Sequence, residues 1–134
     1  MDYPRMNELK QVVDEINKLI QTQPWFDFEI MSLEDDLKVV GGLDLFYPTS
    51  DDYDLLITFS NVFYISSLMS WRTDTSKKFL RVLENEEFFA MNIKHQIEQG
   101  NYVFIISAED HEEGLYYIVA ENISYKIVNR DTFL

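Results

Sequence analysis

The sequence predicts an α+β fold, a single domain over residues 1–134 in which two amphipathic helices pack on a strongly coiled, mainly antiparallel sheet. Two segments repeat apolar residues at steps of three and four, which is the period of a helix. Most of the remaining chain alternates with the period of two that is typical of strands. The chain has 134 residues, of which 46% are hydrophobic, and this is enough for one ordinary domain with a core.

The first helix is expected over residues 5–22. Asp2 and Pro4 suit its start, and Pro24 suits a position beyond its end, because proline has no amide hydrogen to donate. Polar residues fill the intervals between the apolar ones, so one face should be buried. That face consists of Met6, Leu9, Val12, Val13, Ile16, Leu19 and Ile20.

The second helix is expected over residues 86–99. Asn85 is a suitable N-cap, and Gly100 is a suitable terminating residue in the left-handed conformation. The predicted buried face consists of Phe88, Phe89, Ile93 and Ile97. A charge at Ile16 of the first helix or at Ile93 of the second should therefore destabilise the fold.

Strands are expected between the helices. One runs from Phe26 to Ile30, and a turn at residues 34–36 leads into a second over residues 37–47. The pair Gly41-Gly42 indicates a bulged or coiled strand there, with a two-glycine hairpin as the alternative. A loop follows at Pro48–Asp52. Residues 55–65 form either one long bent strand or two paired strands.

Three more strands are expected after the second helix. Residues 102–108 and 115–121 flank a polar loop and so predict a hairpin, and residues 123–127 alternate as a last strand. The hairpin strands are apolar on both faces, which places them centrally in the sheet. The order of elements also permits a duplication of a helix and three strands. The residues expected to be buried in the sheet are Phe59, Phe104, Ile106, Ile118 and Val119.

Charge is unevenly distributed along the chain, whose net charge is −13. Residues 27–54 carry nine acids against one base, whereas residues 55–83 carry four bases against one acid. Such a field repels nucleic acid and anionic membranes, and it attracts basic surfaces. We therefore expect a protein partner with a basic surface, and no nucleic-acid or membrane partner. The candidate partner-binding residues are Asp35, Asp36, Asp44, Asp51, Asp52 and Asp54.

The sequence contains no recognisable catalytic or metal-binding motif. The chain has no cysteine and only two histidines, and its glycines form no phosphate-binding loop. Asp51, Asp52 and Asp54 offer oxygen ligands for a divalent cation, but Leu56 and Ile57 interrupt the spacing of a calcium loop. We expect no catalytic residue, no metal and no cofactor. The basic residues of the segment 72–81 are interpreted as an exposed linker and strand that neutralise part of the acidic surface.

These observations predict a non-enzymatic protein–protein interaction module. An acidic chain of this size is typical of bacterial inhibitors and immunity-type proteins that dock on a basic surface. The alternative is a small-molecule binding module with an aromatic-lined pocket between sheet and helices, or an acid–base enzyme in that pocket. The start of the chain lacks a secretory signal, and no apolar run approaches the roughly 18 residues that span a bilayer, so we expect a cytoplasmic location.

Overall fold

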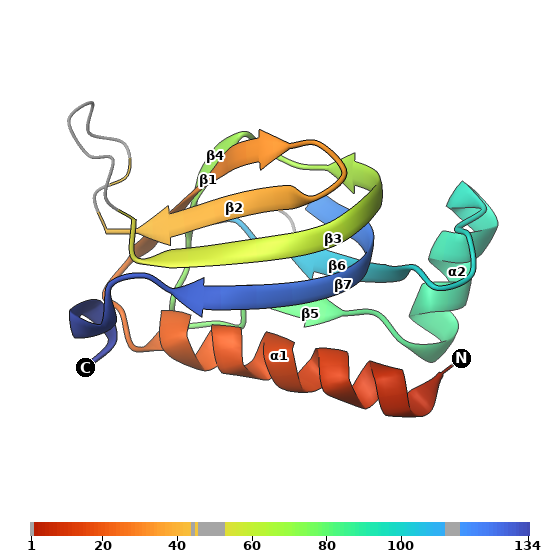
Figure 1. Ribbon diagram of the computed structural model, residues 1–134, viewed down its shortest axis with the longest axis horizontal. Helices are drawn as coiled ribbons and strands as arrows, with labels where there is room; N and C mark the ends of the chain where they lie inside the picture. The colour runs from red at the N-terminus through yellow and green to blue at the C-terminus, as the bar shows by residue number, and fades with distance from the viewer. Residues whose placement is uncertain (1, 44, 46–52, 112–115) are drawn as a thin grey trace.

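The sheet curls around one long helix (Figure 1). The computed structural model describes residues 2–43, 45, 53–111 and 116–134, and within these ranges it contains two α-helices, seven strands and a short 3-10 helix. The predicted α+β class is confirmed. The elements are α1 (Tyr3–Gln21), β1 (Phe26–Leu33), β2 (Leu37–Gly42), β3 (Leu55–Ser66), β4 (Ser70–Thr73), β5 (Leu80–Val82), α2 (Asn85–His95), β6 (Tyr102–Ile106), β7 (Tyr116–Ile127) and η1 (Arg130–Phe133).

The seven strands form one antiparallel sheet in the order β4-β1-β2-β3-β7-β6-β5, which curls into a half-barrel. β6 and β7 are interior strands, as predicted, and residues 55–66 form one long strand, the first of the two alternatives. The expected break between residues 121 and 123 is wrong, because β7 runs unbroken along β3. The sequence indicated a strand within the segment 72–81 but not its bounds, and the structure places two short strands, β4 and β5, at the ends of that segment. They have four and three residues, too few to display an alternating pattern.

The helix α1 fills the concave side of the half-barrel. The Asp2 carboxylate accepts a hydrogen bond from the Arg5 amide (3.0 Å) and caps the helix, as the sequence indicates. Five of the seven residues of the predicted apolar face are buried, and Val12 and Leu19 are partly buried against the same core. All five residues that the sequence predicts to be buried in the sheet are also buried.

Asn17 joins α1 to the edge strand β5. Its amide nitrogen donates to the Leu80 carbonyl (2.7 Å), and its amide oxygen accepts from the backbone N–H groups of Phe79 (3.2 Å) and Leu80 (3.1 Å). The side chain is buried, and these three bonds satisfy it as a buried amide requires. The Asn17 side chain thus forms hydrogen bonds with the backbone at the start of β5 that a neighbouring strand would otherwise form.

Gly41 permits close packing of aromatic rings beside β2. The ring of Phe28 stacks on Trp71 (5.5 Å between centroids) and on Phe79 (4.7 Å). A Cβ at Gly41 would lie 2.8 Å from a ring carbon of Phe28 and even closer to the Phe26 ring. The strand pairs regularly with β1 and β3 at Gly41, so the bulge and the alternative hairpin expected at these glycines are wrong, while the expected coiling of the sheet is confirmed. β2 ends at Gly42, earlier than the predicted strand over residues 37–47. Glycine is required at position 41 because a side chain there would collide with the Phe26 and Phe28 rings.

The helix α2 differs most from its prediction. It ends at His95, four residues early, because Gln96 adopts the left-handed conformation (φ 50°) expected of Gly100. None of its eleven residues is buried, and Ile93 is 83% exposed and Phe89 50% exposed. The helix stands at one end of the sheet and does not lie across it (Figure 1). The predicted buried face is therefore wrong, except that Phe88 is partly buried and that Ile97 is buried in the segment after the helix.

Aspartate substitutions at Ile16 of α1 and Ile93 of α2 should have very different effects on the free energy of unfolding. Ile16→Asp should lower the free energy of unfolding by several kcal/mol, because it places a charge in the core. Ile93→Asp should change it by less than about 1 kcal/mol, because the side chain is in solvent. Denaturant unfolding of both variants measures this, and similar losses in both would contradict the loose packing of α2.

Candidate functional site

Carboxylates from three separate parts of the chain line a hollow at one end of the sheet. Glu34 and Asp35 belong to the turn between β1 and β2, Glu98 follows α2, and Glu121 lies in β7. The hollow has a volume of about 260 Å³. Its remaining lining residues are Asn61, Val62, Phe63 and Asn101.

Asn61 connects the acidic groups around this hollow. Its backbone N–H donates to the Asp36 carboxylate (3.0 Å), and its side-chain amide donates to the Glu121 carboxylate (2.9 Å). The next residue, Val62, donates its N–H to the Asp35 carbonyl (2.8 Å). Asn61 has a left-handed backbone (φ 50°), which asparagine tolerates better than most residues. The bend in β3 therefore holds the β1–β2 turn in place.

The charge of the hollow is not neutralised by ion pairs. Within the described ranges, no lysine or arginine forms an ion pair with Glu34, Asp35, Glu98 or Glu121, although Lys38 lines an adjoining hollow on the same turn. Four carboxylates in one hollow give a locally negative field. Ion pairs elsewhere in the described ranges join Arg5 to Glu8, Lys10 to Glu84, Arg72 to Asp27, Lys77 to Asp74 and Arg81 to Glu87.

The structure separates the predicted partner-binding residues. Asp35 and Asp36 directly precede β2, and Asp54 lies at its other end, where its N–H donates to the Gly41 carbonyl just before β3 begins. Asp54 is engaged in the fold, since its carboxylate accepts from the Thr132 hydroxyl (2.9 Å) and its carbonyl accepts from Val128 (2.9 Å). The remaining candidates, Asp44, Asp51 and Asp52, lie outside the described residues.

Sequence reasoning missed Glu34, Glu98, Glu121 and Asn61 as site residues. Glu34 adjoins the predicted Asp35, whereas Glu98 and Glu121 reach the hollow only through the tertiary fold, so no local pattern marks them. Asn61 did carry a signal, because an asparagine within an apolar strand is typical of an irregular backbone.

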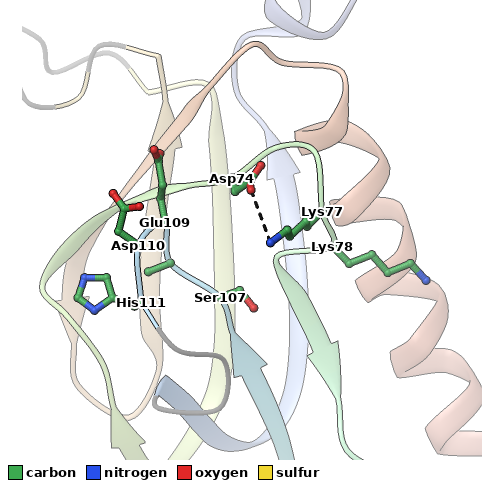
Figure 2. A pocket seen from close by; sticks show the side chains of 8 residues that line it. Asp74, Lys77, Lys78, Ser107, Glu109, Asp110 and His111 are labelled. Atoms are coloured by element: carbon green, nitrogen blue, oxygen red, sulfur yellow. Dashed lines mark ion pairs between the residues drawn. The ribbon is translucent and has the colours of Figure 1, made fainter.

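A second hollow, of about 480 Å³, carries charges of both signs (Figure 2). Asp74 and Lys77 form an ion pair on one side of it (3.9 Å), and Glu109, Asp110 and His111 lie on the other. Hydrogen bonds from the Ser76 hydroxyl and amide, together with the nearby Lys77, hold the pKa of Asp74 below its usual range. This mixture of charges favours a solvated surface over an anion site.

Two arginines of the basic segment 72–81 form ion pairs, although Thr73, Phe79 and Leu80 of this segment are buried and it is not exposed throughout. Arg72 pairs with the buried carboxylate of Asp27 (2.8 Å), and Arg81 pairs with Glu87 (3.0 Å). Figure 2 shows the Lys78 side chain extending away from Glu109 and Asp110. Arg72, Lys77 and Arg81 therefore pair with three different acids, and these bases do not form a continuous positive patch.

Two further structural observations concern metals and membranes. Across residues 2–43, 45, 53–111 and 116–134, no three histidine or carboxylate side chains are grouped so that they could hold a metal ion. In the same ranges, neither helix has the length and apolar character of a membrane span.

The chain matches no protein-family model, and no curated protein or solved structure is significantly similar to it. Only the charges and exposed apolar groups of the described surface therefore bear on function.

Substitutions at Asn61 should report on the bend that organises the hollow. Asn61→Gly keeps access to the left-handed backbone and should cost about 1 kcal/mol, the value of a lost hydrogen bond. Asn61→Val should cost about 1–3 kcal/mol more, because a β-branched residue is strained at positive φ. Thermal or denaturant unfolding measures the difference, and equal stability of the two variants would show that the bend is not required.

Proposed function

We propose that this protein is a non-enzymatic interaction module whose acidic end docks on a basic surface of another protein. The observation that carries the proposal is the hollow that Glu34, Asp35, Glu98 and Glu121 line without ion-pair partners in the described part of the chain. Like charges held together disfavour the compact state through self-repulsion, and a basic partner would relieve that repulsion. Complementary charge also speeds encounter and suppresses wrong partners.

The hollow also presents an aromatic side chain. Phe63 lies at the irregularity in the β3–β7 register, lines the hollow and is 39% exposed. Aromatic residues in the centre of a polar rim are typical of protein interfaces, where they contribute much of the binding energy. This combination supports a protein partner over a free cation.

An inhibitor or immunity-type role agrees with this chemistry. In that role the acidic end would cover a basic active site or nucleic-acid-binding surface of the partner, in the cytoplasm of a bacterial cell. The net charge of −13 supports a partner other than nucleic acid. Capture from the native host would identify the partner.

The aromatic residues of the concave side favour this proposal over an enclosed ligand pocket. Phe28 packs between Trp71 and Phe79, and Phe59 meets Phe104 edge-on at 5.4 Å. These rings belong to the cluster that α1 covers. They support a packed core more than the lining of a pocket.

Neutralising the hollow should abolish capture of the partner. The site variant combines Glu34→Gln, Asp35→Asn, Glu98→Gln and Glu121→Gln. The control variant removes the same number of charges at exposed positions elsewhere, with Asp14→Asn, Glu29→Gln, Glu109→Gln and Asp131→Asn. In capture from the native host, we expect one basic partner with the wild type and the control at low salt, and loss of it with the site variant and at high salt.

The purified partner then permits a kinetic test. The association rate should fall at least about tenfold in the site variant and much less in the control, because steering depends on the local field. Stability should not fall, since like charges are removed. Equal capture by both variants would contradict the proposal.

A further inference from the structure

A groove beside α2 adjoins the acidic hollow. It has a volume of about 440 Å³ and lies between α2 and the segment that leads into β6. Glu98 and Asn101 line both the groove and the hollow, so the two form one continuous surface. The other lining residues of the groove are Asp2, Phe88, Phe89, Asn92, Ile97, Gln99, Gly100 and Tyr102.

The surface of α2 next to this groove is apolar and exposed. Phe89 lines the groove and is half-exposed, and Ile93, one turn further along the same side of the helix, is 83% exposed. Only Phe88 and Met91 of α2 pack against the small cluster on that face of the sheet. Within the described ranges, the fold itself leaves these two large apolar side chains uncovered.

The charges around the apolar residues define what can cover them. Asp2 and Glu98 line the groove, Glu86 lies in the first turn of α2 beside Glu87, which pairs with Arg81, and the other three carboxylates of the hollow continue the surface. Lys94 and His95 lie at the far end of the helix. An apolar group that enters the groove therefore passes a mainly acidic border.

We propose that the α2 groove and the acidic hollow are one docking site for a protein segment that presents an apolar side chain flanked by lysine or arginine. The inference rests on the proposed function and specifies the chemistry of its partner. The acids set the rate of encounter, and the burial of an apolar side chain beside Phe89 and Ile93 sets the lifetime of the complex. A second copy of this chain is disfavoured as the occupant, because a symmetric contact would bring two acidic surfaces together.

The test begins with selection of a displayed random-peptide library on the immobilised full-length protein. Enriched peptides should combine lysine or arginine with an adjacent large apolar residue. The most enriched peptide is then synthesised, and its binding kinetics are measured with wild type, with Ile93→Ser, with Phe89→Ser and with Val128→Ser. Val128 is also exposed but lies beyond β7 near η1, so it serves as the matched control.

Ile93→Ser and Phe89→Ser should each raise the dissociation rate about tenfold while the salt dependence of association stays unchanged. Val128→Ser should bind as the wild type does. Ile93 is so exposed that its variant should fold normally, which keeps the test valid even if Phe89→Ser unfolds.

Failure of this inference can be distinguished from failure of the proposed function. If the acidic site variant slows association but Ile93→Ser and Phe89→Ser bind like the wild type, the groove is not part of the site and the inference is overturned, while the proposed function stands. If the acidic variant also has no effect, both are overturned. Enriched peptides without basic residues, or a wild-type dimer that Ile93→Ser dissociates, would likewise overturn the inference.

Discussion

The packing of α1 into the concave side of the curled sheet is the constraint on which the rest of the structure depends. Its apolar face supplies Met6, Leu9, Val13, Ile16 and Ile20 to the core, and Asn17 ties the helix to the short strand β5. Gly41 leaves room for the phenylalanine rings between helix and sheet. Because these packed side chains occupy the concave side, the proposed docking site lies at one end of the half-barrel.

The two ends of the sheet differ in chemistry. At one end, Asp54 bonds to the chain around η1 and contributes to the fold. At the other, the bend at Asn61 brings the β1–β2 turn against β3, and the segment after α2 adds Glu98. Acidic groups and exposed apolar groups therefore adjoin where α2 stands away from the sheet. Complexes that combine charge attraction with a buried apolar anchor associate quickly and dissociate slowly.

The parts of the fold that were predicted correctly are those in which the local spacing of apolar residues determines which side chains are buried. The face of α1 and the buried residues of β6 and β7 follow from apolar spacing, which tertiary contacts here reinforce, whereas the same spacing left open whether β3 is one strand or two. The same reasoning failed for Ile93 and Phe89, because a pattern shows which residues share a face but not whether the fold supplies anything to cover it. The candidate site was predicted only at Asp35 and Asp36. Glu98 and Glu121 join them through strand order, which adjacent residues do not encode.

The central claim is that partner recognition is located at the α2 end of the molecule. The most direct measurement is a map of backbone amide chemical-shift changes as the selected peptide is titrated into the protein. The account predicts changes concentrated at residues 33–36, 61–63, 86–102 and 121, with the core-facing residues of α1 unaffected. Changes concentrated instead around the mixed-charge hollow, at residues 74–78 and 107–111, would contradict it.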